Sequence, residues 1–190
     1  VVRAIRREHP DFVVHTGDLI EDGRNERLWQ EFFQLERDLL RETVFAPVIG
    51  NHEIVRPGSS GVELFRKYVR CGAPSPQPEL DGLLRYGPVR VLLANAYDDW
   101  TRDELRDWLD RTLATARAEV PTGWLFVVMH WGLCSSGPHG ENRAMRAAGI
   151  DALLRKHRVE LLVSGHDHLY ERGDDQGLPY LVTGGGGAPL

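Results

Sequence analysis

The stretch LLVSGHDHLYER, residues 161–172, joins a short apolar run to a polar cluster. The apolar run ends at Gly165, and His166 and His168 then flank a single aspartate. Two histidines at this spacing are ambiguous on their own, because a polar turn after a strand can hold such a pair without binding anything. The rest of the chain therefore decides whether this stretch is a structural turn or part of a functional site.

Short apolar runs of the same kind recur along the chain. Several are apolar throughout, which is typical of strands that are covered on both faces. The proline-rich residues 73–82 between two of the runs are predicted to form a loop. The predicted strands are residues 12–16, 44–50, 89–95, 124–130, 160–164 and 180–184.

Helical patterns lie between these strands. Apolar side chains repeat at helical spacing in residues 28–39 and again in residues 105–113. Thr101 and Glu104 have the spacing of a capping box ahead of the second helix. A third, weaker helical pattern covers residues 145–154. The alternation of strands and helices predicts an α/β fold.

Length and composition limit the classes of protein to consider. The 190 residues are enough for one domain with a buried core, so we expect residues 1–190 to form a single domain. A net charge of −5 argues against a dedicated nucleic-acid binder, and no apolar run approaches the length of a membrane span. Cys71 and Cys134 lack CxxC spacing, which excludes a zinc ribbon or a dithiol redox motif.

Polar residues collect at the carboxyl ends of four predicted strands. Gly17-Asp18 follow the first strand, and GNHE, residues 50–53, follow the second. His130 ends the fourth strand, and residues 166–168 follow the fifth. In α/β sheets, ligands bind outside the carboxyl ends of the strands. Carboxylate, amide-oxygen and imidazole ligands without thiolates suit a divalent ion such as Mn, Fe, Zn, Co or Mg.

Such a set of residues also suits two metal ions. The two oxygens of one aspartate can each face a different ion, and a two-metal site lowers the pKa of bound water from about 15.7 to around 7. It also stabilises both sides of an in-line displacement at phosphorus. On this interpretation, His166 and His168 leave the same turn so that each reaches a different metal.

The ordered motifs GD, GNHE, H and GHDH resemble those of the calcineurin-like metallophosphoesterases. The tail HWGLCSSGPHGEN…SGHDHLYER…YLVTGGGGAPL resembles the purple-acid-phosphatase-like branch of that superfamily. The resemblance implies a four-layer sandwich of two mixed β-sheets flanked by helices. It also implies a phosphoester hydrolase that acts on a small-molecule substrate through water activated by two divalent metal ions.

The resemblance also assigns roles to residues that match the family's motifs. Asp18 is similar to the carboxylate that bridges the two metals, and His168 is similar to a ligand of the second metal. His52 resembles a histidine that contacts the phosphate and helps to protonate the leaving group. His139, nine residues after His130, resembles an outer histidine that touches the substrate. The remaining ligands of the first metal are matched by Asn51, His130 and His166.

The sequence departs from the family pattern in three places. The first family motif, D-x-H, does not precede Asp18 and should lie on a strand upstream of Val1. We therefore expect a domain that is incomplete at the N-terminus and at the C-terminus, with an incomplete second metal site. Glu21 stands where the purple enzymes carry a tyrosine, which implies a colourless protein. Trp131-Gly132 replace the usual x-Pro after the histidine of the third motif, which implies a different wall of the substrate pocket.

Several functions compete within this interpretation. The tail favours a phosphomonoesterase of the acid-phosphatase type, and a phosphodiesterase acting on cyclic nucleotides or phospholipids is the alternative. A non-catalytic scaffold that retains the fold is the alternative from another class. A scaffold predicts eroded ligands, whereas every ligand position that this sequence covers is filled. A metallo-β-lactamase-type hydrolase is disfavoured because its H-x-H-x-D-H motif is missing.

Overall fold

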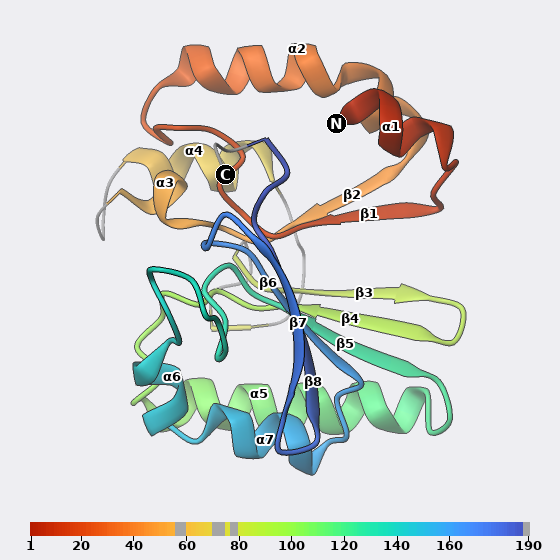
Figure 1. The fold of residues 1–190 in the computed structure, drawn as a ribbon, viewed down its shortest axis with the longest axis vertical. Coiled ribbons are helices and arrows are strands. Elements are labelled where there is room, and N and C mark those ends of the chain that lie inside the picture. Colours follow the sequence, from red (N-terminus) through yellow and green to blue (C-terminus); the bar gives the residue numbers. More distant parts are fainter. Residues whose placement is uncertain (56–59, 70–74, 77–79, 188–190) are drawn as a thin grey trace.

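A computed structural model describes residues 1–55, 60–69, 75–76 and 80–187. Two β-sheets lie face to face, with helices on the outer side of each (Figure 1). The predicted α/β sandwich with flanking helices is therefore confirmed. Of the residues predicted to form the proline-rich loop, 73–74 and 77–79 lie outside the described part of the chain. Among the described residues, no helix has the length and apolar character needed to cross a bilayer.

The smaller sheet consists of two parallel strands, β1 (Phe12–His15) and β2 (Val44–Pro47). Helix α1 (Val2–Arg7) precedes β1, and α2 (Glu26–Glu42) connects the two strands. The side chain of Asn25 caps α2 by accepting a hydrogen bond from the amide of Arg27.

The outer side of this sheet is completed by α2 and by two shorter helices. α2 buries Trp29 and Leu39, whereas Leu35, which was expected on the same apolar face, is 75% exposed. The short helices α3 (Asn51–Ile54) and α4 (Ser60–Tyr68) follow β2. Neither was predicted from the sequence; α3 has only four residues, too few to show a helical repeat.

The larger sheet is mixed and has the strand order β3-β4-β5-β6-β8-β7. The strands β4, β5, β6 and β8 run parallel, and an antiparallel strand closes each edge. The edge strands β3 and β7 were not predicted, and the sequence of β7, YERGDD, shows why, because an edge strand need not be apolar. The bounds are β3 Gly82–Tyr86, β4 Val89–Leu93, β5 Trp124–Val128, β6 Leu161–Ser164, β7 Tyr170–Asp175 and β8 Leu178–Thr183.

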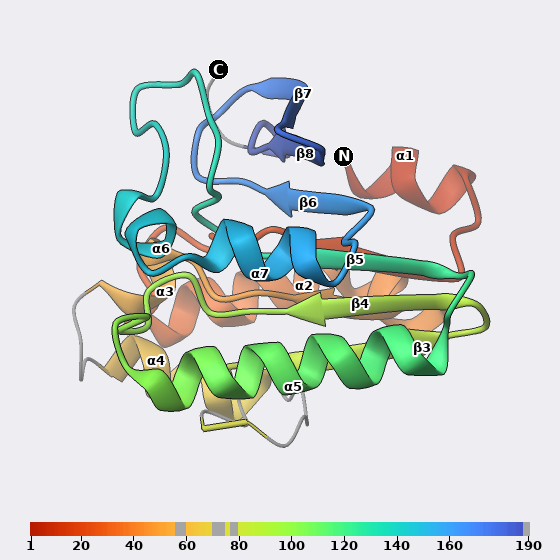
Figure 2. The same ribbon diagram turned by 90° about the horizontal axis from the view of Figure 1, so that it is seen from below.

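Three helices, α5 (Asp103–Glu119), α6 (Arg143–Ala147) and α7 (Ile150–Lys156), lie on the outer side of the larger sheet (Figure 2). The predicted capping box is wrong, because α5 begins after Arg102 and the hydroxyl of Thr101 donates to Asp99 instead. The single helix predicted in residues 145–154 is two helices. Gly149 separates them with a φ of 76°, a left-handed conformation that suits glycine.

Three apolar clusters of the described residues hold these layers together, and one of them includes Trp29 of α2 and Phe65 of α4. The largest cluster lies between the mixed sheet and its helices and includes Leu105, Leu109 and Leu113 of α5 with Leu125 and Leu162 of the sheet. The third lies between the two sheets. Its buried members are Ala46, Val48, Val91, Leu93 and Val128. Packing between the sheets brings the carboxyl ends of β1 and β2 close to those of β5 and β6.

Asp81 is a fully buried carboxylate that precedes β3 and accepts a hydrogen bond of 2.9 Å from the amide of Asn95. Burial raises its pKa to about 6, although the bonds from Asn95 and Ser75 act in the opposite direction. An aspartate in the unfolded chain titrates near about 3.9. Its ionisation therefore lowers the stability of the fold as the pH rises from about 4 to about 6.

We expect Asp81→Asn to gain stability over the parent protein as the pH rises through this window, because asparagine stays neutral. The difference in unfolding free energy should grow by up to about 3 kcal/mol, at 1.36 kcal/mol per pKa unit. Urea unfolding at pH 4, 5, 6 and 7 measures it, with Asp107→Asn on the exposed side of α5 as the control. A difference that does not change with pH would contradict the prediction.

Candidate metal centre

The predicted site residues follow four strands and meet at one end of the sandwich. Asp18 lies three residues after β1, and Asn51 is the first residue of α3, which follows β2. His130 lies two residues after β5, and His166 lies two residues after β6. Since β1 and β2 belong to one sheet and β5 and β6 to the other, the site is assembled from both sheets.

Four potential ligand atoms converge around Nε2 of His130. This nitrogen lies 3.1 Å from Oδ2 of Asp18 and 3.0 Å from Oδ1 of Asn51. It also lies 3.2 Å from Nδ1 of His166. One ligand atom from each of Asp18, His130 and His166 lies within 4.8 Å of the other two. These distances are short enough for one ion to contact several of the atoms at once.

The other ring nitrogen of His130 fixes where its proton lies. Nδ1 lies 2.6 Å from the carbonyl oxygen of Thr16, which can only accept, so Nδ1 carries the proton and donates it. In the neutral ring, Nε2 then presents a lone pair to the oxygens of Asp18 and Asn51. Lone pairs facing one another at this distance repel unless a proton on Nε2 or a metal ion lies among them. The donor set therefore fits a divalent metal ion, and the bond to Thr16 is the outer contact that metal-binding histidines commonly make.

Neighbouring groups orient the two oxygen ligands. The hydroxyl of Tyr97 donates to Oδ1 of Asn51 at 3.1 Å, which identifies this atom as the amide oxygen. The backbone amide of His52 donates to Oδ1 of Asp18 at 3.0 Å and leaves Oδ2 facing His130. Tyr97 follows β4, and nothing in the local sequence marked it as part of the site.

The backbone is strained where the ligands emerge. Asp18 and His166 have φ values of 54° and 66°, in the left-handed region that non-glycine residues rarely adopt. Gly50 makes room for Asp18, because a Cβ atom there would lie 2.1 Å from Oδ1 of the aspartate. Such strain is retained only where surrounding contacts stabilise it.

The main stabilising contact is the carboxylate of Glu53, which is completely buried. Its Oε2 accepts the amides of Gly50 at 2.8 Å and Asp18 at 3.0 Å. Its Oε1 accepts the amides of Leu19 at 2.6 Å and Ile20 at 3.3 Å. Glu53 thereby connects the loop after β1 to the start of α3. The motif GNHE contained this residue, but its position alone gave no reason to assign it a role in the site.

Burial and the charge of Asp18 raise the pKa of Glu53 to about 7, while the amides of Gly50 and Ile20 lower it. All four hydrogen-bond partners of Glu53 are backbone amides, which can only donate. They therefore suit the ionised carboxylate, whose two oxygens have enough lone pairs to accept all four bonds. Burial would also raise the pKa of Asp18, but His130 and His52 hold it below its ordinary value.

His166 is suited to bind a metal as a neutral imidazole. Burial, followed by the proximity of His130 and His139, lowers its pKa to about 4, so the ring is uncharged at neutral pH. The neutral ring is the form that coordinates metal ions. The ring of Trp131 lies 5.3 Å from that of His166, measured between centroids, and forms an aromatic wall beside the site.

The remaining predicted residues lie at different distances from this centre. Nε2 of His52 is 3.9 Å from Oδ2 of Asp18, and the ring of His139 lies 4.1 Å from that of His166. His168 is exposed and lies outside the cluster of three ligand atoms described above. The side chain of Glu21, at the position of the family's tyrosine, is 86% exposed. The assigned roles of these residues stay predictions.

The sequence profile described as calcineurin-like phosphoesterase matches residues 1–170 of the chain. The chain belongs to the calcineurin-like phosphoesterase family. The resemblance drawn from the four motifs is therefore confirmed, and the relatives below place this phosphoesterase chain near the purple acid phosphatases.

Three relatives illustrate how far the likeness of this phosphoesterase chain extends. An uncharacterized protein of Mycobacterium tuberculosis is 30% identical over 190 residues, which cover 89% of this chain and 36% of the relative. Purple acid phosphatase 21 of Arabidopsis thaliana is 28% identical, with 96% of this chain and 45% of the relative covered. In structure, purple acid phosphatase PPD1 from yellow lupin seeds matches with a TM-score of 0.82 at 24% identity. That match covers 100% of this chain and 39% of the lupin chain.

The phosphoesterase chain thus spans less than half the length of the curated relatives it matches. The structural similarity to the lupin protein covers the whole chain and shows a shared fold.

Glu53→Gln tests the role of the buried carboxylate. Glutamine offers one oxygen in place of two, so two backbone amides lose their acceptor, at about 1–3 kcal/mol each. We expect the unfolding free energy to fall by about 2–4 kcal/mol and metal affinity to fall about 10- to 100-fold, as for other outer contacts. Thermal unfolding and metal titration measure both, with the exposed Glu63→Gln on α4 as the control. Unchanged metal affinity would show that Glu53 supports the fold alone.

Proposed function

We propose that the protein is a metal-dependent phosphoester hydrolase, and that phosphomonoesters are its substrates. The observation that carries the proposal is the convergence of lone pairs from Asp18, Asn51, His130 and His166, described above, at a point that fits a cation. Two divalent ions would supply a water of low pKa and would stabilise negative charge on the phosphoryl oxygens. Asp18 would contact both ions, and His168 would contribute to the second.

His52 would donate the proton to the leaving group. Its Nδ1 lies 2.7 Å from the carbonyl oxygen of Glu21, so Nδ1 donates there and Nε2 points toward Asp18. Burial lowers the pKa of His52, but the carbonyl of Glu21 and the charge of Asp18 raise it more, so the pKa lies above its ordinary value. A protonated Nε2 at the edge of the ligand cluster is placed to protonate a departing alkoxide or phenoxide.

Monoesters are favoured by the names of the similar proteins, among them purple acid phosphatase 21. Diesters, including cyclic nucleotides and phospholipids, remain the alternative substrate class. The scaffold alternative is disfavoured by the site itself, because a scaffold has no need to keep a buried, oriented ligand set with two strained backbone positions.

The proposal is tested by hydrolysis of para-nitrophenyl phosphate and of bis(para-nitrophenyl) phosphate, before and after removal of metal with a chelator. We expect hydrolysis to need the metal and to favour the monoester. Asp18→Asn should lower the activity more than about 100-fold, beyond the loss from an outer contact, and lower the metal content. Asp174→Asn, at an exposed position of β7, is the matched control. Full activity after chelation would refute a metal-dependent mechanism, and preference for the diester would select the alternative.

We expect His52→Ala to lower turnover on the order of 10²- to 10⁴-fold while metal content stays the same, because a general acid contributes that much. The loss should shrink for esters with very acidic leaving groups, which need little protonation. A series of substituted phenyl phosphates measures this dependence, and elemental analysis gives the metal content. If the variant loses its metal, His52 is a ligand and another group protonates the product.

A further inference from the structure

The segment that carries His139 is part of the long connection between β5 and α6, and few regular hydrogen bonds hold it. His139 is exposed, yet its ring packs against the ring of His166 with 4.1 Å between centroids and 38° between planes. An exposed side chain on an irregular loop keeps such a contact only if the loop itself is fixed. The contacts of residues 134–139 show what fixes it.

The aspartate of the GHDH motif contacts this segment directly. Asp167 is only 1% exposed, and its Oδ1 accepts the backbone amide of His139 at 3.0 Å. Its Oδ2 accepts the hydroxyl of Ser135. The same hydroxyl oxygen accepts the amide of Gly137 at 3.0 Å. One buried carboxylate thus holds both ends of a short turn, and the residue it bonds at the far end is His139.

The fit around Asp167 leaves no room for a side chain at Gly137. A Cβ atom there would lie 2.3 Å from Cγ of Asp167. The turn can therefore approach the carboxylate only because this position is glycine. The segment SSGPH, residues 135–139, therefore fits against Asp167 both sterically and through its hydrogen bonds.

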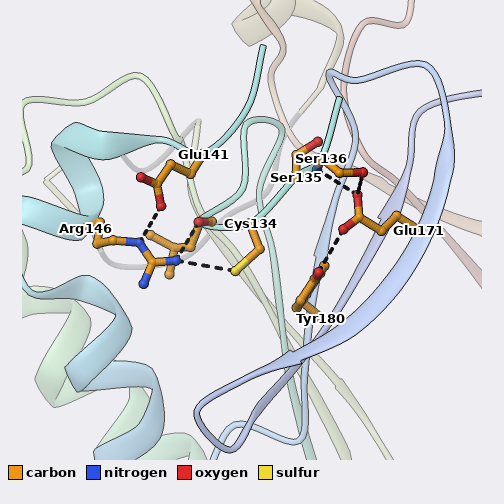
Figure 3. A pocket seen from close by; sticks show the side chains of 8 residues that line it. Cys134, Ser135, Ser136, Glu141, Arg146, Glu171 and Tyr180 are labelled. Atoms are coloured by element: carbon orange, nitrogen blue, oxygen red, sulfur yellow. Dashed lines mark hydrogen bonds and ion pairs between the residues drawn. The ribbon is translucent and has the colours of Figure 1, made fainter. Parts of the chain in front are cut away.

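A second acidic residue, Glu171 on β7, also bonds to this segment. Its partner is Ser136, the residue after Ser135. Its Oε2 accepts the amide of Ser136 at 2.8 Å and the hydroxyl of Ser136 at 2.7 Å. Its Oε1 accepts the hydroxyl of Tyr180 on β8 at 2.8 Å, which orients the carboxylate (Figure 3). Both acidic residues therefore bond to the same short segment, residues 135–139.

A pocket of about 270 Å³ lies beside the start of the segment, at residues 133–136. It is lined on its other sides by Arg146 of α6, by Glu171 and by Tyr180 (Figure 3). Arg146 donates to the carbonyl oxygen of Leu133 at 2.8 Å and to Sγ of Cys134 at 3.5 Å. Leu133 belongs to the largest apolar cluster and Cys134 packs against it, whereas hydrogen bonds to Asp167 and Glu171 hold residues 135–139.

We propose that Asp167 and Glu171 together form an acidic clamp on residues 134–139, and that Asp167 is a positioning residue for His139. His166 of GHDH faces the ligand cluster, and the aspartate that follows it faces the neighbouring loop. The clamp rests on contacts alone, whereas its effect on catalysis rests on the function proposed above. Asp167 acts through the position of His139 and does not itself touch the substrate.

Hydrogen exchange of the metal-loaded protein tests the clamp independently of activity. In Asp167→Ala, the amide of His139 loses its acceptor, and exchange in residues 135–139 should speed up about tenfold or more. Asp167→Asn keeps an oxygen for His139 and can donate to Ser135, so it should restore most of the protection. Glu171→Ala should speed exchange at Ser136. Asp174→Ala, on the same strand but outside the clamp, should leave the segment unchanged.

A double-mutant cycle then asks whether Asp167 acts through His139. We expect Asp167→Ala and His139→Ala each to lower kcat/KM for para-nitrophenyl phosphate on the order of tenfold to a hundredfold, at unchanged metal content. The double variant should be no worse than His139→Ala alone, because the position of a missing ring has no further effect. Asp167→Asn should recover most of the activity.

The outcomes separate the clamp from the proposed function. Exchange that is equally slow in Asp167→Ala and in the parent protein would overturn the clamp, whether or not the protein hydrolyses esters. Additive losses, or metal lost from Asp167→Ala, would overturn the positioning role, because the aspartate would then act on the ligand turn itself. Faster exchange in a protein without phosphoesterase activity would uphold the clamp and refute the function.

Discussion

The carboxylate of Glu53 is the contact on which the rest of the site depends. It accepts four backbone amides, three of them from Asp18, which has a left-handed backbone, and the two residues that follow it. A buried carboxylate is costly unless it is fully hydrogen-bonded, and here the backbone of two loops provides every bond. These hydrogen bonds offset the free-energy cost of burying the charge. They also fix the loop after β1 against the start of α3. Asp18 and Asn51, which follow separate strands, are thereby held in a fixed position relative to each other.

The second constraint is the distribution of protons among the ligands. The carbonyl of Thr16 accepts a hydrogen bond from Nδ1 of His130, the hydroxyl of Tyr97 donates to Oδ1 of Asn51, and burial keeps His166 neutral. Each of these contacts leaves a lone pair of a candidate ligand turned inward. A divalent ion would bind these lone pairs together, so metal binding should stabilise the folded protein.

The stretch LLVSGHDHLYER serves more than one purpose because its side chains alternate in direction. His166 faces the ligand cluster, whereas Asp167 and Glu171 face the loop that carries His139. The ligand turn and the outer histidine are therefore not independent parts. A change in the turn is transmitted to the loop through two carboxylates.

By itself, the sequence determined the fold class and the family, and it predicted the candidate metal ligands. Apolar runs with polar residues at their carboxyl ends are local patterns, and the direction of parallel strands brings those ends together. The sequence misplaced the start of α5 and missed β3 and β7, because side-chain contacts and edge position overrode local propensity there. Only the tertiary structure decided the contacts of Glu53, Tyr97 and Asp167, whose partners lie 35, 46 and 28 residues away along the chain. It also decided that His166 joins the ligand cluster while His168 is exposed and lies outside it. Such contacts follow from how two sheets pack, and no local pattern records which distant backbone amide a buried carboxylate will meet.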